Sequence, residues 1–190
     1  MTSMLSLLWL AVPIIAAGLA HLLVLKFDLL PGLRRSPMDF GLTLRGRRLF
    51  GDNKTWRGAF VTIGTTTLAA WLLARVSDCC WHLPTLTPFA STHSLTWGLL
   101  LGAGYIAGEL PNSFAKRQIG IAPGGSGQGF SGRAFWVVDQ IDSLIGMLIA
   151  ISPVWRPSFA LLVTILAIML VAHPLSAWIM MQFGLKDRVG

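Results

Sequence analysis

The chain has 190 residues, of which 54% are hydrophobic and only 12% are charged, and its mean hydropathy is +0.65. This composition is too apolar for a soluble domain, and the length fits one compact unit. We therefore expect a single integral membrane domain over residues 1–190. The net charge of +7 does not indicate nucleic-acid binding, because the sequence does not resemble a soluble basic domain with stacking aromatic residues.

Apolar segments that approach or exceed the length of a bilayer-spanning helix, about 20 residues, alternate with polar segments along the chain. They predict an all-α, polytopic membrane fold with five transmembrane helices and two functional cytoplasmic loops. The predicted helices are at about 4–25, 59–76, 95–110, 135–154 and 159–181, and the loops at about 26–58 and 111–134. The third helix is short and glycine-rich, but small residues also let membrane helices pack closely.

Lysine and arginine are distributed unevenly over the connections, and in short loops such an excess marks the cytoplasmic side. Most of them lie between residues 26 and 58, and others are Lys116, Arg117, Arg133, Lys186 and Arg188. The opposite face has only Arg75 and Arg156. We therefore predict a multi-pass protein of the cytoplasmic membrane, with its N-terminus outside and its C-terminus in the cytoplasm. Attraction to anionic lipid headgroups is a second explanation of this charge.

The first loop ends in a basic, glycine-rich segment, GRRLFGDNKTWRG, at residues 46–58. Glycines let a backbone approach a ligand, basic side chains donate to phosphate, and the amides at the following helix start favour an anion. The segment lacks the P-loop pattern. We interpret it as a phosphate cradle, with a basic juxtamembrane turn as the alternative. The candidate substrate-binding residues are Gly51, Asn53, Lys54, Thr55, Arg57 and Gly58.

Three carboxylates, Glu109, Asp139 and Asp142, lie inside or at the edge of apolar segments. A charge near the bilayer centre costs about 2.5 to 3.5 kcal/mol on insertion scales, so such residues indicate a functional site unless they lie at the water boundary. Asp139 and Asp142 are three residues apart, which places both on one face of a helix, as a shared pair of magnesium ions or a metal-bound triphosphate requires. The alternative is a carboxylate pair that complements a helix dipole.

Two other polar features have simpler explanations. The glycine-rich segment 123–132 has the composition of a flexible linker, with a mobile lid over a nucleotide as the alternative. His21 lies within the first apolar segment without a carboxylate or cysteine at metal-ligand spacing, so we expect it to be structural.

The motif SFAKR at residues 113–117, followed by D-x-x-D at 139–142, resembles the signature of membrane CTP-dependent phosphatidate cytidylyltransferases. The element G-x-N-K-T-W-R-G at residues 51–58 is similar to that of the CDP-archaeol synthase branch, whose small members have five helices. The segments HPL at 173–175 and GLK at 184–186 also resemble the end of that branch. The resemblance covers nearly the whole chain.

This resemblance implies a magnesium-dependent reaction of CTP with a membrane lipid phosphate, which gives a CDP-activated lipid and pyrophosphate. It implies that the catalytic residues are Asp139, Asp142, Lys116 and Arg117. Both aspartates would hold metal and triphosphate, and Glu109 would be a further metal contact. Ser113 would donate a hydrogen bond, and the first-loop residues would line the nucleotide or lipid-phosphate site. The residue pattern does not distinguish an isoprenoid ether lipid from a diacyl lipid, nor does it indicate an oligomeric state.

Two other classes of function compete with this hypothesis. A small ion-coupled transporter would also place carboxylates in the membrane. Against it, the chain shows no internal duplication, and its polar residues cluster toward one face. A non-catalytic membrane scaffold would leave those carboxylates and the segment 53–57 without a role.

Overall fold

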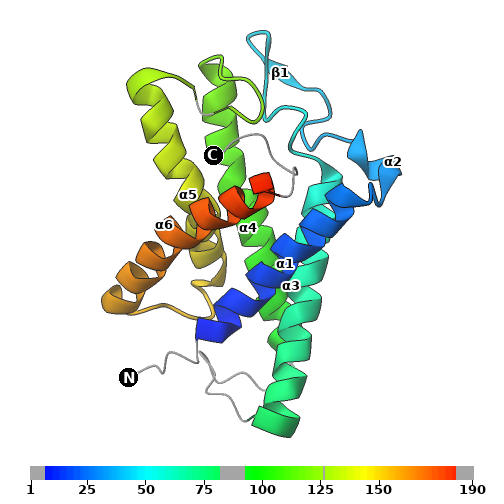
Figure 1. Cartoon of the computed structure of the whole chain (residues 1–190), viewed down its shortest axis with the longest axis vertical. Coiled ribbons are helices and arrows are strands. Elements are labelled where there is room, and N and C mark those ends of the chain that lie inside the picture. Colours follow the sequence, from blue (N-terminus) through cyan, green and yellow to red (C-terminus); the bar gives the residue numbers. More distant parts are fainter. Residues whose placement is uncertain (1–6, 82–92, 126, 183–190) are drawn as a thin grey trace.

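The computed structural model describes residues 7–81, 93–125 and 127–182, which fold into a bundle of long helices (Figure 1). Within these ranges the helices are α1 (Leu8–Lys26), α2 (Pro31–Arg34), α3 (Trp56–Val76), α4 (Ser94–Gln118), α5 (Gly129–Ile151) and α6 (Phe159–Gln182). A π-helical turn, η2 (Ser77–Trp81), continues α3. Two short strands, β1 (Thr43–Leu44) and β2 (Arg47–Arg48), form an antiparallel hairpin. The predicted all-α character of the fold is confirmed.

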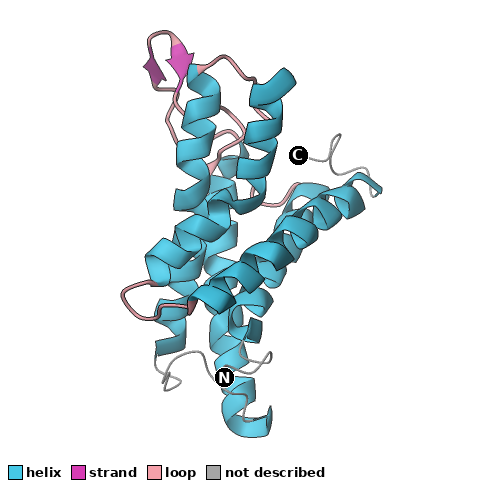
Figure 2. Ribbon diagram, turned by 90° about the vertical axis from the view of Figure 1, so that its left-hand side faces the viewer, coloured by secondary structure: helices cyan, strands magenta, loops and turns pink. Residues whose placement is uncertain are grey.

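The long helices pack in a chain of neighbours. Helix α3 packs between α1 and α4, α4 packs against α5, and α6 contacts α5 while it runs obliquely to the other helices (Figure 1). The hairpin lies at one end of the bundle (Figure 2). Both polar connections, residues 27–55 and 119–128, meet at this end, since a Cβ atom on Gly51 would lie 3.0 Å from Pro123. Arg47 also donates a hydrogen bond to the carbonyl oxygen of Gln118, the last residue of α4.

The apolar core lies toward the opposite end of the bundle. It includes Trp9 at the start of α1, Trp97 at the start of α4 and Ile151 at the end of α5, all of them at most 2% exposed. The Nε1 atom of Trp97 donates to the carbonyl oxygen of Trp9 at 2.9 Å. Packing thus holds the helices together at the end that is far from the polar connections.

Several helices have the length and hydropathy of membrane spans. In the described part of the chain these are Leu8–Lys26, Trp56–Cys80 and Gly129–Ile151, and Phe159–Val171 is a shorter apolar stretch. Helix α4 is not among them, because its glycines and polar residues lower its hydropathy. Large aliphatic side chains such as Ile15 and Ile149 are 60% and 66% exposed, as is typical of surfaces that face lipid.

Glycines allow α4 to approach both of its neighbours closely. A Cβ atom on Gly98 would lie 2.5 Å from the Cα of Thr67 in α3. On another face of α4, a Cβ atom on Gly108 would lie 2.9 Å from the Cα of Gly146 in α5. Real Cβ atoms essentially never approach this closely, so these positions require glycine. The resulting backbone contact is the small-residue packing expected of membrane helices.

The third helix and the loop after it differ from the prediction. Helix α4 does not end near residue 110 but continues to Gln118, so the connection to α5 is 119–128 rather than 111–134. Pro111 is tolerated inside α4, although it removes one helical hydrogen bond. Residues 129–132, predicted as part of a glycine-rich linker, belong to α5. The tail residues Lys186 and Arg188, and the segment 184–186, lie outside the described residues.

Candidate functional site

The C-terminal half of α4 carries a stripe of polar side chains. Their spacing of three and four residues places them on one face of the helix. The stripe consists of Glu109, Asn112, Ser113, Lys116 and Arg117. All but Glu109 are at most 9% exposed. The continuation of the helix through Pro111 is what aligns them.

Asn112 and Lys116 of α4 bind the two aspartates of α5. The Nδ2 atom of Asn112 donates to Asp139 at 2.6 Å and to Asp142 at 2.7 Å. The Nζ atom of Lys116 lies 2.6 and 2.5 Å from the two carboxylate oxygens of Asp139, and it also lies 5.9 Å from the ring centroid of Phe135. We call Asn112, Lys116, Asp139 and Asp142 the carboxylate centre.

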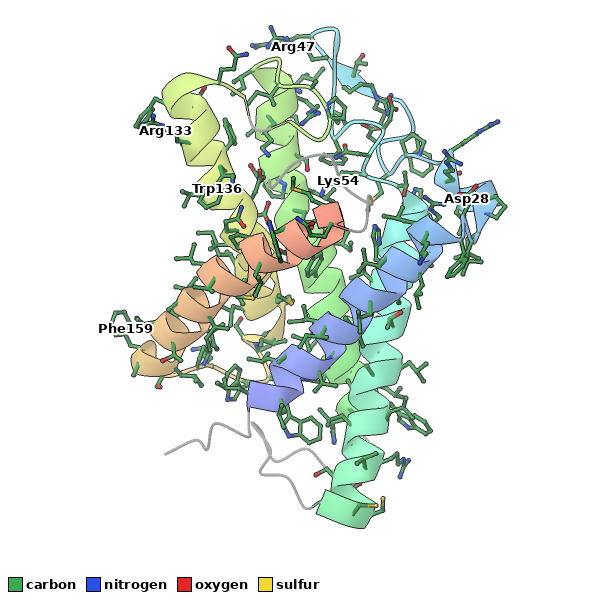
Figure 3. The ribbon with its side chains drawn as sticks, viewed as in Figure 1. Asp28, Arg47, Lys54, Arg133, Trp136 and Phe159 are labelled. Atoms are coloured by element: carbon green, nitrogen blue, oxygen red, sulfur yellow. The ribbon has the colours of Figure 1, made fainter. Side chains whose placement is uncertain are left out.

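The first loop reaches this centre through Lys54. Its ammonium group forms an ion pair with Glu109, and both of these residues interact electrostatically with Asp142. Figure 3 shows Lys54 near the middle of the polar end of the bundle, whereas Arg133 lies on the far side of α5. The structure therefore brings Lys54, Glu109, Asp139, Asp142 and Lys116 together and leaves Arg133 outside.

Arg117 lies beneath the turn at Gly51. The residue is 6% exposed, and its Nε and NH1 atoms are buried and have no hydrogen-bond partner in the described part of the chain. Gly51 has a φ of +96°, and a Cβ atom there would lie 3.0 Å from Pro123 and 3.5 Å from the Cδ atom of Arg117. Only glycine suits this backbone conformation and this close approach. Buried guanidinium donors without partners normally carry a large free-energy cost, so they indicate a ligand.

Other predicted first-loop residues have mainly structural contacts. Thr55 caps α3 by accepting a hydrogen bond from the amide of Gly58 at 3.3 Å. Arg57 is 8% exposed and donates to Asp28 at 2.9 Å, which ties α3 to the segment after α1. Asn53 is exposed on the turn before α3. Thr55 and Arg57 thus support the loop beside the carboxylate centre.

His21 of α1 lies near the site, which the sequence alone did not indicate. A Cβ atom on Gly58 would lie 3.4 Å from its Cε1 atom, so the two helices meet there. His21 also interacts electrostatically with Glu109 and Lys54. The position of this histidine depends on the packing of α1 against α3, for which the sequence contains no local signal.

Asp39 organises the first loop, and sequence reasoning assigned it no role. Its side chain is fully buried and lies 2.5 Å from Arg48, and it accepts hydrogen bonds from the amides of Gly41, Phe50 and Gly51 at 3.0 to 3.1 Å. Burial raises the pKa of Asp39, but the hydrogen bonds from Arg48 and the three amides outweigh it and hold the pKa well below its usual range. The carboxylate therefore fixes the turn that covers Arg117.

We predict that Asp39→Asn lowers the free energy of unfolding by about 1.5 to 3 kcal/mol near neutral pH, since hydrogen bonds to a charged group are lost. Folding lowers the pKa of Asp39. Its contribution to the free energy of unfolding is therefore complete at pH values above the unfolded-state pKa of about 3.9. It is lost as the pH falls below that value toward the lower folded pKa. Thermal unfolding in detergent should show a difference between variant and parent that narrows in acid. Asp52→Asn is the control, because that side chain is 78% exposed; an equal effect of both variants would contradict the role of Asp39.

The donor set at the carboxylate centre fits a hard divalent cation. In the described residues no group of three or more His, Cys, Asp and Glu side chains could hold a metal ion by themselves. Magnesium, however, is usually bound by one or two carboxylates together with substrate phosphates. Asp139 and Asp142 supply these carboxylates, and the Oδ1 atom of Asn112 is a buried acceptor that no described residue pairs with. Glu109 is paired with Lys54, and its role as a metal ligand stays a prediction.

Comparisons with known proteins identify similar sequences and one similar structure. A family model described as CarS-like, CDP-archaeol synthase, matches residues 2–189. The CDP-archaeol synthase of Methanospirillum hungatei is 33% identical over 145 residues, which cover 73% of this chain and 78% of that protein. The CDP-archaeol synthase of Halobacterium salinarum is 34% identical over 162 residues, which cover 80% of this chain and 82% of that protein. A solved structure described as an intramembrane enzyme for archaeal membrane lipid biosynthesis is 26% identical, covers 93% of this chain and 95% of that chain, and has a TM-score of 0.66.

Proposed function

Because the chain belongs to the CDP-archaeol synthase family, we propose that the carboxylate centre and the first loop form its active site. The family makes the chain a CTP-dependent cytidylyltransferase of membrane lipid biosynthesis, which acts on an archaeol-type lipid phosphate. The resemblance inferred from the motifs is confirmed. The transporter and scaffold hypotheses are not needed.

The protein is a multi-pass membrane protein, and we propose that all five long helices cross the bilayer. The polar connections then lie on the cytoplasmic side, where the basic residues of the first loop are concentrated. The N-terminus is outside and the C-terminus is in the cytoplasm. In this orientation the carboxylate centre lies at the cytoplasmic boundary, where soluble CTP meets a phosphate whose hydrocarbon chains stay in the membrane.

Buried Arg117 is the observation that best supports a phosphate site. Its Nε and NH1 donors have no hydrogen-bond partner among the described residues, they lie close to the turn at Gly51, and Asp139 is near enough to interact with Arg117 electrostatically. Guanidinium donors match phosphate oxygens in geometry and charge. We assign Arg117 and Lys116 to the triphosphate of CTP, and Lys54, which is paired with Glu109 in the structure, to a further phosphate contact.

We propose Mg²⁺ as the cofactor, held by Asp139 and Asp142 together with nucleotide phosphates. When bound, the ion would neutralise charge on the transferred and leaving phosphates. The protein groups contribute orientation. Asn112 holds both carboxylates in one arrangement, and Lys116 neutralises Asp139 in the absence of substrate.

The reaction needs no covalent intermediate with the protein. An oxygen of the lipid phosphate attacks the α-phosphorus of CTP, the bond from that phosphorus to the bridging oxygen breaks, and pyrophosphate leaves. Positioning and electrostatic stabilisation supply most of the catalysis in such a displacement. Lys116 and Arg117 stabilise the charge that develops. Ser113, which is buried on the same face of α4, is assigned a hydrogen-bonding role toward the substrate.

Arg117→Gln tests this proposal. Loss of the guanidinium group should raise the KM for CTP by about tenfold or more, because a charge-assisted contact to phosphate contributes about 1.5 to 3 kcal/mol. The measurement is transfer of label from α-labelled CTP to lipid as a function of CTP concentration. Arg133→Gln removes the same charge from an exposed position on α5 and serves as the control. Equal CTP dependence in both variants would remove Arg117 from the nucleotide site.

A further inference from the structure

A short juxtamembrane segment, residues 26–35, begins at the end of α1 and includes α2. Helix α1 has the length and hydropathy of a membrane span and ends at Lys26. The residues that come next must therefore lie at the boundary between hydrocarbon and water. Figure 1 shows α2 projecting sideways from the ends of α1 and α3, with the hairpin beyond it. The juxtamembrane segment thus lies beside the bundle, at the level of the membrane surface.

Apolar side chains of this segment are exposed. Phe27, Leu29 and Leu30 are 61%, 48% and 49% exposed. The backbone is also left-handed at Asp28, with a φ of +45°, and at Leu30, with a φ of +56°, a conformation that bulky residues rarely adopt. Exposed leucines on such a backbone are unfavourable in water. Contact with the hydrocarbon boundary of a membrane would bury these side chains and offset the strain.

The same segment carries more positive charge than its contacts neutralise. Lys26, Arg34 and Arg35 are all exposed. The single carboxylate of the segment, Asp28, lies 3.0 Å from Arg34 and 2.9 Å from Arg57 of α3. In the described part of the chain, Lys26 and Arg35 have no carboxylate partner. Unpaired basic residues next to the end of a spanning helix are attracted to anionic headgroups.

Aromatic side chains mark the same level on α3. Trp56 begins this helix, and its ring centroid lies 6.0 Å from that of Phe40 and 5.7 Å from that of Phe60. Phe40 and Phe60 are 74% and 55% exposed. Tryptophan is enriched where membrane and water meet. Because α2 contacts α3, these rings and the juxtamembrane segment belong to one interfacial surface.

We propose that the juxtamembrane segment binds the headgroups of anionic phospholipids in the surrounding membrane. Its basic side chains match their phosphates in charge, and its exposed apolar side chains match the adjoining hydrocarbon. A segment that is tethered to the end of a spanning helix is always in contact with lipid, which favours lipid over a protein partner. Figure 3 shows Asp28 at the outer edge of the polar end and Lys54 near its middle, so this lipid is distinct from the one that reacts.

Arg57 connects the juxtamembrane segment to the first loop. Its side chain is 8% exposed, and it donates to the carboxylate of Asp28 at 2.9 Å and to the carbonyl oxygen of Leu29 at 3.4 Å. It lies in the first turn of α3, three residues after Lys54. A lipid headgroup bound by Arg34 and Arg35 would therefore also hold the start of α3 in place. We expect anionic lipid to stabilise the folded protein for this reason.

Titration with phosphatidylglycerol tests this inference. The full chain in detergent would be titrated with phosphatidylglycerol or with zwitterionic phosphatidylcholine, and its melting temperature measured. We expect phosphatidylglycerol to raise the melting temperature more than phosphatidylcholine does. In Lys26→Gln/Arg35→Gln, the concentration that gives half of this increase should be about tenfold higher or more, because each basic residue adds to the attraction. Neither residue has a carboxylate partner in the described residues, so the variant should fold.

Arg45→Gln/Arg133→Gln is the matched control, since it removes two charges from exposed positions outside the juxtamembrane segment. Its half-maximal concentration should stay close to that of the parent. An equal change in both double variants would overturn the local site and indicate attraction to the whole basic face. A parent protein that phosphatidylglycerol stabilises no more than phosphatidylcholine does would also overturn the inference. None of these outcomes depends on cytidylyl transfer, so the proposed function is tested separately.

Discussion

Asp142→Asn should reduce CTP-dependent cytidylyl transfer by about 1,000-fold, because it removes a charge that the reacting phosphates and metal need while keeping the shape of the side chain. Asp142 accepts a hydrogen bond from Asn112 at 2.7 Å. An amide at this position can still accept that bond, so the fold should be kept. The measurement is the initial rate of label transfer at saturating CTP.

Asp52→Asn is the matched control for this variant, since it makes the same chemical change on an exposed side chain of the first loop. It should keep nearly full activity, because Asp52 is not part of the carboxylate centre. Its exposed ion pair with Arg48 contributes little to stability, so the fold should be kept as well. Thermal unfolding of both variants in detergent should resemble that of the parent. Normal turnover by Asp142→Asn would exclude this carboxylate from the reaction.

Gly146→Leu is expected to have the second large effect, through the contact between α4 and α5. A Cβ atom at position 146 would lie 2.5 Å from the Cα and 2.6 Å from the amide nitrogen of Gly108. The helices must therefore separate, at a cost of about 1 to 3 kcal/mol for overpacking. Separation would move Asp139 and Asp142 away from Asn112, and a misplacement of about 1 Å can lower a rate about 100-fold.

Gly64→Leu provides the comparison, because nothing lies within 4 Å of a Cβ atom at that position in α3. This variant should keep both its melting temperature and its activity. Gly146→Leu should lower both, with activity falling further than stability alone explains. If the two variants behave alike, the glycine contact between α4 and α5 does not position the carboxylate centre.

The sequence predicted the residues of the site better than their arrangement. Asp139 and Asp142 were predicted to share a helix face, and the structure places both carboxylates on Asn112. The role of Asn112 itself was missed, because the third helix was expected to end near Pro111. The spacing of Glu109, Asn112 and Lys116 is the signal that could have indicated a longer helix.

Other contacts could not be predicted, because they join segments that are far apart in the chain. Asp39 binds backbone amides up to 12 residues away and Arg48 across a hairpin, and short basic loops give little indication of such pairing. The ion pair between Lys54 and Glu109 spans 55 residues. Both residues were singled out for their charge, but a single sequence does not tell which carboxylate each lysine meets.

The most direct test of the central claim is transfer of label from α-labelled CTP to lipid by the detergent-purified protein. The assay would include Mg²⁺ and, in parallel, isoprenoid-ether and diacyl glycerophosphates. We predict that label enters the organic phase with the isoprenoid lipid, that a chelator abolishes the transfer, and that Asp142→Asn does not support it. CTP binding without transfer to either lipid would contradict the assigned acceptor, and transfer that persists in Asp142→Asn would contradict the assigned site.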